Sequence, residues 1–326
     1  MTAPVPMAEI WRGPFLESIH HGHAVICDEA GEIVQAWGDP DALVLPRSSS
    51  KMIQALPLIE SGAAARHNLT SEHLALACAS HKGADIHTSR VSAWLKALGL
   101  TDDAFRCGPQ VPTDEAARDA LIVAGKAPCQ IHNNCSGKHT GFLTLNQHIG
   151  GGENYVDLDH PVQKAMVDVW ERCTQETVAG FGIDGCSAPN FATSLHGVAR
   201  AMAHFASAPD DSPPAMLRNA MAMHPELVAG EGRACTNLMR AMNHRVAIKT
   251  GAEAFFVAII PEKKLGVALK ISDGTTRAAE CAIAAILVKL GVLEADHPET
   301  AKYLNAAIRN WNGIQTGWLR AAPPMC

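Results

Sequence analysis

The chain has 326 residues, of which 47% are hydrophobic and 18% are charged. This composition excludes a disordered chain, a collagen and a coiled coil, and it indicates a globular protein with a large core. The 27 Lys and Arg against 33 Asp and Glu give a net charge of −6 and are scattered along the chain, so we expect no nucleic-acid partner.

The first residues of the chain and the lengths of its apolar runs indicate where in the cell the protein is expected. The opening segment, MTAPVPMAEIWRGPFLESIHHGHAV, has no unbroken apolar stretch behind a basic start, so we expect no export signal. No later run approaches the roughly 18 consecutive apolar residues of a membrane-spanning helix. We therefore expect a cytoplasmic protein that does not bind membranes, with its ten irregularly spaced cysteines kept as thiols.

The first predicted elements are strands, and helices follow. Residues 15–38 are expected to form a hairpin, because alternating apolar and β-branched residues flank a turn around Gly31. From residue 48 to about 207 the apolar residues recur every three to four positions, which predicts a series of helices. A proline pair ends the loop at 209–214 and opens a further helix.

The last third of the chain returns to strands. Residues 244–272 predict three strands, and helices are expected at about 276–289 and 298–309. This order predicts an α+β fold, in which one antiparallel sheet is built from both chain ends and packed with helices. We expect a single unit over residues 1–326, with a sheet part at about 1–47 and 244–326 and a mostly helical part at about 48–243.

The segment SSSK at 48–51 is the first candidate for chemistry. A serine three residues before a lysine places hydroxyl and amine on one helix face, and a desolvated neutral lysine can take the serine proton. Ser48 could therefore be a nucleophile with Lys51 as its base. Taken alone, the pattern favours the alternative of a helix N-cap beside a solvated lysine.

The segment Lys249-Thr250-Gly251 lies at the end of a predicted strand. In penicillin-recognising enzymes a Ser-x-x-Lys helix lies beside a Lys-Thr-Gly strand, and here both motifs occur in that chain order. Together they indicate a serine amidohydrolase or acyl-transfer enzyme, and a structural origin for both motifs is the alternative. The Ser-Asp-Asn element of the penicillin-recognising enzymes is absent.

Cysteines occur in three polar turns. Cys135 lies near Lys138 and His139, Cys186 follows Asp184, and Cys235 lies in the segment AGEGRACTNL. Thiols from separate loops can converge on a soft metal such as zinc. No Cys-x-x-Cys pair is present, so the spacing by itself favours no metal site.

Long motifs occur in order along the chain: RGPFLESIHHGHAV, PRSSSKMIQALP, ACASHKGADIH, HNNCSGKHTGF, DGCSAPNF, and GRACT followed by KTGAEAFF. Through them the chain, from about residue 8 to 290, resembles the rhizobial-type L-asparaginase family, the asparaginase II group. The resemblance implies hydrolysis of L-asparagine to L-aspartate and ammonia. It also implies a fold similar to serine β-lactamases and glutaminases, and a homodimer.

The resemblance also implies roles for single residues. Ser48 would be the nucleophile and Lys51 its base, with Ser80 and Lys249 as a second Ser-Lys pair beside them. Two lysines in close approach disfavour each other's charged form, as an amine base requires. The residues expected to bind the substrate are Asp184, Arg47, His139 and Cys235.

A zinc site is implied by the same resemblance. Cys135, Lys138 and Cys186 match the positions that hold zinc in the family. The Zn²⁺ would support substrate binding and would not itself hydrolyse the amide. Lys138 would have to lose its proton to bind the metal.

Two alternatives to an asparaginase remain. One is another serine acyl hydrolase of the β-lactamase or glutaminase type, and the missing Ser-Asp-Asn element and the absence of an export signal disfavour it. The other is a non-catalytic protein of this fold that binds a small ligand or zinc. The presence of both serines and both lysines disfavours it.

Overall fold

The computed structural model describes residues 2–325, so Cys326 lies outside the described part. The chain divides into two compact units. One contains residues 2–49, 193–207 and 234–325, and the other contains residues 50–192 and 208–233. The chain therefore passes from the first unit into the second directly after Ser49.

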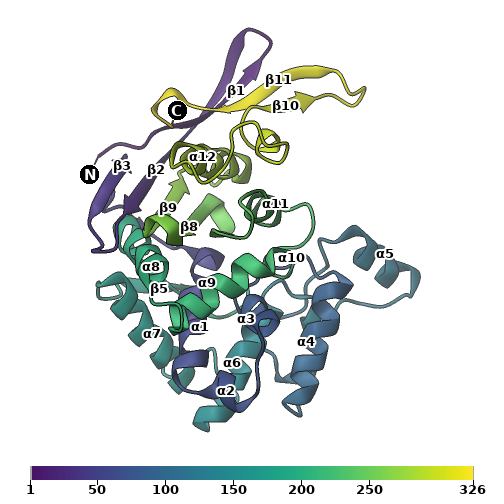
Figure 1. Cartoon of the computed structure of the whole chain (residues 1–326). Coiled ribbons are helices and arrows are strands. Elements are labelled where there is room, and N and C mark those ends of the chain that lie inside the picture. The colour runs from purple at the N-terminus through teal and green to yellow at the C-terminus, as the bar shows by residue number, and fades with distance from the viewer. Residues whose placement is uncertain (1, 326) are drawn as a thin grey trace. The chain divides into compact units, whose positions relative to one another are not determined.

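An antiparallel sheet forms the first unit. Its strands are β1 (Val5–Arg12), β2 (Phe15–Cys27), β3 (Ile33–Trp37), β7 (Ala247–Thr250), β8 (Phe255–Ile260), β9 (Leu265–Ile271), β10 (Ala306–Arg309) and β11 (Gln315–Ala321). They run in the order β10-β11-β1-β2-β9-β8-β7, and β3 pairs with β2. In Figure 1 the purple N-terminal strands lie beside the yellow C-terminal ones. The prediction of an α+β fold with one sheet from both chain ends is confirmed.

Helices of the same unit pack on this sheet. They are α8 (Leu195–Ser207), α11 (Ala234–Ala241) and α12 (Thr276–Lys289). Both α8 and α12 contact β9, and α11 contacts β7. The approach of α8 to β9 depends on Gly266, since a Cβ there would lie 2.0 Å from the amide nitrogen of Ala203.

The prediction of a helix at about 298–309 is wrong. One short turn at Thr300–Lys302 is followed by β10, which forms a hairpin with β11, and Ala306 pairs with Leu319. The alanines of this segment favour a helix locally, but pairing with β11 outweighs that preference. Strand β1, which the sequence did not predict, pairs with both β11 and β2.

The second unit is mostly helical. Its helices are α1 (Lys51–Glu60), α2 (Ala63–Arg66), α3 (Ser71–Ala77), α4 (Asp85–Ala97), α5 (Glu115–Val123), α6 (Ser136–Ile149), α7 (Pro161–Thr174), α9 (Pro213–Met223) and α10 (Pro225–Val228). It also contains a hairpin of β5 (Gly180–Ile183) with the first part of β6 (Pro189–Ser194), which the sequence did not predict. The last two residues of β6, Thr193 and Ser194, belong to the first unit. There they pair with β4 (Leu43–Val44).

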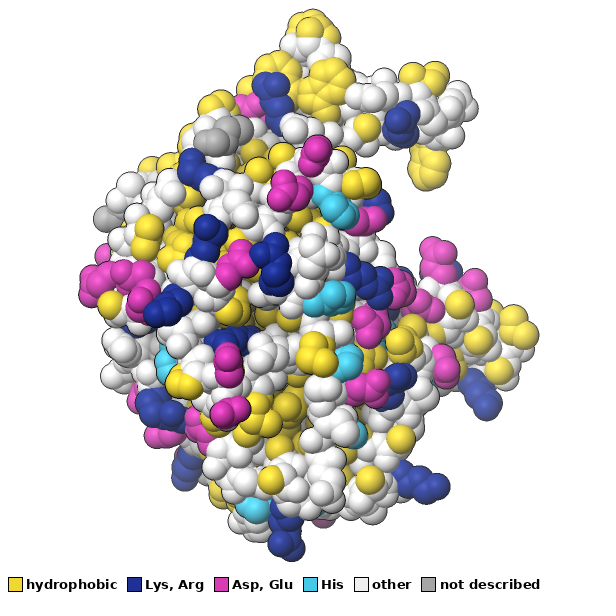
Figure 2. All heavy atoms as spheres, in the orientation of Figure 1, with side chains coloured by type: hydrophobic (Ala, Val, Ile, Leu, Met, Phe, Trp, Pro, Cys, Tyr) yellow, Lys and Arg dark blue, Asp and Glu magenta, His cyan; other side chains and the backbone are white. Residues whose placement is uncertain are grey.

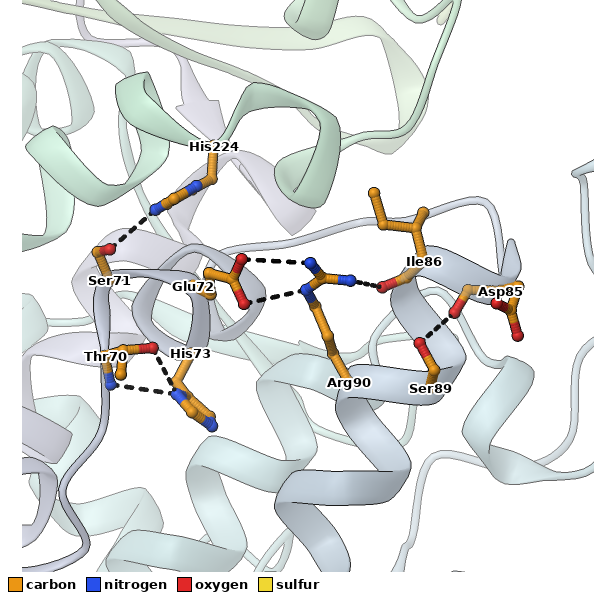
Figure 3. Close-up of polar contacts among 9 residues, drawn as sticks. All are labelled: Thr70, Ser71, Glu72, His73, Asp85, Ile86, Ser89, Arg90 and His224. Atoms are coloured by element: carbon orange, nitrogen blue, oxygen red, sulfur yellow. Dashed lines mark hydrogen bonds and ion pairs between the residues drawn. The ribbon is translucent and has the colours of Figure 1, made fainter.

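Helix α3 leads directly to Ser80, and side-chain contacts hold it in place. Thr70 is the N-cap residue of this helix, and its backbone N–H donates to His73 Nδ1 at 3.1 Å. Figure 3 shows Glu72 facing Arg90 of α4, with two hydrogen bonds of 3.0 and 3.2 Å between them. The helix ends at Ala77, three residues before Ser80.

The surface carries mixed charges. On the face drawn in Figure 2, blue basic and magenta acidic side chains are interspersed. Among residues 2–325, no helix has both the length and the apolar content needed to cross a membrane.

Candidate active site

Ser48 lies in a short 3-10 turn, Arg47–Ser50, directly before α1. Ser49 Oγ of this turn donates to the carbonyl oxygen of Phe255 at 3.2 Å. The turn also lies against Gly251, where an added Cβ would be 2.6 Å from the Pro46 carbonyl oxygen. The Lys-Thr-Gly segment and the turn that carries Ser48 are therefore in direct contact within the first unit.

Lys249 is buried on β7, and its Nζ donates to the carbonyl oxygen of Thr250 at 2.8 Å. Cys235, on α11, is also buried. The backbone N–H of Thr250 donates to Cys235 Sγ at 3.3 Å. Cys235 therefore lies against the strand that carries Lys249. Arg47, another expected substrate-binding residue, is half-buried and directly precedes Ser48.

Lys51 is the first residue of α1 and is only 1% exposed. Its Nζ lies 2.9 Å from Ser80 Oγ and 3.1 Å from Cys135 Sγ, and it also donates to the carbonyl oxygen of Ala79. The alternative of an N-cap serine beside a solvated lysine is wrong, because the lysine is buried and no side chain caps α1. A buried amine at this distance from a hydroxyl can exchange a proton with it.

The start of α6 places three expected site residues on one face. Cys135, Lys138 and His139 are spaced as neighbours on a helix surface, and all three are buried. Asn133 fixes the helix start, since its Oδ1 accepts from the backbone N–H of Cys135 at 2.8 Å. Asn133 Nδ2 in turn donates to the carbonyl oxygen of Cys107 at 2.9 Å.

Cys186 comes to the same place from the loop between β5 and β6. In this loop the backbone N–H of Ser187 donates to the carbonyl oxygen of Asp184 at 2.9 Å, and Ser187 adopts a φ of 68°. Cys186 is buried, and Lys138 Nζ donates to its Sγ at 3.1 Å. Asp184 is half-buried and acts electrostatically on Lys138.

The two sulfurs and the amine shift one another's pKa values. A hydrogen bond from Cys135 holds the pKa of Cys186 well below its usual range, and the charge on Lys138 acts in the same direction. The same hydrogen bond raises the pKa of Cys135 well above its usual value. Burial acts to lower the pKa of Lys138, but the neighbouring sulfurs outweigh it and raise that pKa.

Residues 8–321 match the sequence profile of L-asparaginase II. The chain belongs to the L-asparaginase II family. This membership supports an amidohydrolase of the asparaginase type with a small-molecule substrate. No curated protein sequence is similar enough to the chain to count as a match.

Solved structures similar to this asparaginase II chain include the following two, both of low sequence identity. A β-lactamase from Mycobacterium bovis is 12% identical, with a TM-score of 0.47 over 82% of this chain and 94% of the other. An octameric penicillin-binding protein homologue from Pyrococcus abyssi is 11% identical, with a TM-score of 0.36 over 92% of this chain and 83% of the other.

Some residues of the candidate site were not predicted from the sequence. Asn133 precedes a helix start, and the sequence HNNC carries that capping signal. The hairpin that presents Cys186 could have been found from Asp184-Gly185, a turn pair typical of hairpins. Tyr155, whose hydroxyl contacts His139, had no such signal.

Proposed function

We propose that this protein hydrolyses L-asparagine to L-aspartate and ammonia, with Ser48 as the nucleophile and Lys51 as its base. The observation that carries the proposal is the buried amine of Lys51, 2.9 Å from Ser80 Oγ, on the helix that follows the Ser48 turn. Membership of the asparaginase II family supports the substrate.

The reaction runs through an acyl-enzyme. Neutral Lys51 takes the hydroxyl proton of Ser48, and Ser48 Oγ forms a bond to the side-chain amide carbon of asparagine. The C–N bond breaks, and the leaving nitrogen takes a proton to depart as ammonia. Water then attacks the ester, which releases aspartate and returns the proton to Ser48.

Ser80 and Lys249 act as the second pair. Ser80 passes protons between Lys51 and the leaving group, a role that the 2.9 Å contact with Lys51 supports. Lys249 contributes positive charge near the developing oxyanion. Arg47, Asp184, His139 and Cys235 contact the amino acid part of the substrate.

We also propose zinc as an adjunct to substrate binding. The donors that fit it are Cys135 Sγ, Cys186 Sγ and Lys138 Nζ, because zinc prefers sulfur and nitrogen ligands and three of them leave a position open. Among residues 2–325 no three His, Cys, Asp or Glu side chains are grouped to hold an ion. The proposed set takes Lys138 as its third donor, and Lys138 would have to lose its proton to bind the metal. Bound zinc would supply positive charge that orients polar groups of the substrate.

We propose a homodimer as the assembled form, on the basis of the family resemblance. Light scattering of the purified protein tests this. A mass corresponding to one chain of 34.6 kDa would contradict it.

The test of function is ammonia release from asparagine and from glutamine, measured for the wild type and for Ser48→Ala. We expect asparagine turnover in the wild type and none in Ser48→Ala. Ser92→Ala is the matched control, since Ser92 Oγ donates to the carbonyl oxygen of Thr88 in its own helix α4 at 2.6 Å. If asparagine is not hydrolysed but a chromogenic β-lactam is, the alternative of another serine acyl hydrolase holds.

A further inference from the structure

The loop between β7 and β8, which follows the Lys-Thr-Gly segment, contains two residues with unusual backbone angles. Glu253 and Ala254 adopt φ values of 57° and 56°. In this left-handed region the Cβ atom crowds the carbonyl oxygen, so residues other than glycine rarely occupy it. Such residues keep this conformation only where neighbouring groups hold it, and they cluster at functional sites. This left-handed pair therefore requires contacts that hold its shape.

Lys270 on β9 holds the left-handed pair. Its Nζ donates to the carbonyl oxygen of Glu253 at 2.5 Å and to that of Ile271 at 2.6 Å. The Glu253 carbonyl belongs to the peptide group that joins the two left-handed residues, and Ile271 is the last residue of β9. Lys270 is half-buried and lies opposite Phe255 in the pairing of β8 with β9. One amine therefore ties the left-handed pair to the sheet.

The same loop contacts the turn that carries Ser48. Phe255 directly follows the left-handed pair, and its carbonyl oxygen accepts from the backbone N–H of Gly251 at 2.8 Å and from Ser49 Oγ at 3.2 Å. Ser49 and Phe255 are both 0% exposed, so water does not compete for these bonds. All of these residues belong to the first unit. A rotation of the Phe255 carbonyl would therefore shift the turn that carries Ser48.

We propose that Lys270 is a positioning residue for Ser48. It fixes the left-handed pair, the pair sets the direction of the Phe255 carbonyl, and this carbonyl holds Ser49, the neighbour of Ser48. This role rests on the proposed function, in which Ser48 is the nucleophile. Because Lys270 acts through the position of the serine, its loss should slow bond formation at Ser48 and leave substrate affinity nearly unchanged.

Lys270→Met removes the donor and nearly keeps the length of the side chain. We expect kcat for ammonia release from asparagine to fall by about ten- to a hundred-fold, as when a catalytic group is misplaced by about 1 Å. KM should change little, because Ser48 forms its new bond only in the transition state. Lys264→Met is the matched control and should behave like the wild type, since Lys264 lies between β8 and β9 and contacts the exposed Glu29 at 3.4 Å.

The variant Ala254→Gly tests whether Lys270 acts through the left-handed pair. Glycine adopts a left-handed conformation without strain, so the loop then depends less on the Lys270 amine. Lys270→Met should therefore lower kcat clearly less in the Ala254→Gly background than in the wild type. Equal losses in the two backgrounds would overturn the proposal.

Hydrogen–deuterium exchange of the loop gives a result that does not depend on the substrate. The backbone N–H of Gly251 should exchange faster in Lys270→Met than in the wild type and in Lys264→Met, because the Phe255 carbonyl that accepts its bond is no longer held. Unchanged exchange in a folded Lys270→Met protein would overturn the proposal. A folded Lys270→Met protein with a lower Tm but a wild-type kcat would also overturn it, because Lys270 would then be a purely structural residue.

A second variant covers a failure to fold. If Lys270→Met does not fold, Lys270→Gln, whose shorter side chain cannot reach both carbonyls, takes its place in every measurement. Absence of asparagine turnover in the wild type would reject the proposed function, and the exchange of the Gly251 N–H would still decide whether Lys270 holds the loop.

Discussion

Lys51 Nζ lies 2.9 Å from Ser80 Oγ, although 29 residues separate the two along the chain. Lys51 begins α1, and Ser80 follows the end of α3. The buried amine of Lys51 also contacts Cys135 Sγ at 3.1 Å. It therefore links the loop that carries Ser80 to the start of α6. This contact leads to the first two predictions.

Lys51→Met should remove activity while the fold is kept. Methionine fills a similar volume and leaves no buried charge, so the loss is expected in kcat, by ~10²- to 10⁴-fold, the size of a general-base contribution. Steady-state ammonia release measures it. Lys126→Met, at an exposed lysine after α5, should behave like the wild type. Activity of Lys51→Met within a few-fold of the wild type would reject Lys51 as the base.

Ser80→Ala should also lower kcat strongly, because the group that Lys51 contacts is lost. Residues that act as one unit are not additive, so adding Ser80→Ala to Lys51→Met should cost little more. Single-turnover rates for the two single variants and the double variant test this. A fully additive double variant would show that the two residues act separately.

Cys186→Ala should reduce bound zinc and raise KM, with a smaller fall in kcat than Ser48→Ala, since the group that forms the bond remains. Elemental analysis after purification with added zinc, together with kinetics, measures both effects. Cys281→Ala, at a buried cysteine of α12, should keep its zinc. Absence of zinc from the wild type would reject the metal site.

Gly251→Ala should disturb the turn before Ser48. The new Cβ would lie 2.6 Å from the Pro46 carbonyl oxygen and 2.7 Å from Ser49 Oγ, so the turn must move. A small misplacement of a catalytic group can cost about 10²-fold in rate, and we expect a loss of that size in kcat/KM. Gly152→Ala, where no atom lies within 4 Å of the new Cβ, is the control. Equal rates for both variants would contradict the importance of this contact.

The stability of the first unit should depend on Asp273 in acid. Burial acts to raise the pKa of Asp273, but hydrogen bonds from His20 and Thr275 outweigh it and lower this pKa to about 2. The distance from Asp273 Oδ2 to His20 Nδ1 is 2.6 Å. A carboxyl group whose pKa is lower in the folded state stabilises the protein above its unfolded pKa of about 3.9.

This stabilisation should disappear as the pH falls through about 2. Thermal unfolding of the wild type and of Asp273→Asn from pH 2 to pH 6 measures it. The wild type should have the higher Tm at pH 6, and the two curves should converge toward pH 2. A constant difference over this range would mean that the carboxylate charge does not stabilise the fold.

The local parts of the fold could be predicted from the sequence. The hairpin of β2 with β3, the strands β7 to β9 and the helix α12 follow from the spacing of apolar residues and from turn residues, which act between near neighbours. The failures lie where distant partners decide the structure. Ala306 is a good helix former, yet it pairs with Leu319 in a strand.

In the candidate site, too, some features depend on residues close together in sequence and others on contacts between distant segments. The sequence by itself determined the order of the motifs, the spacing of Ser48 and Lys51, and the shared face of Cys135, Lys138 and His139, because these depend on positions a few residues apart. Only the tertiary structure decided that Lys51 reaches Ser80, that a hairpin loop carries Cys186 to Lys138, and that Tyr155 meets His139. These contacts join segments that are distant in sequence, and the packing of the whole helical unit, which no local pattern records, sets their positions.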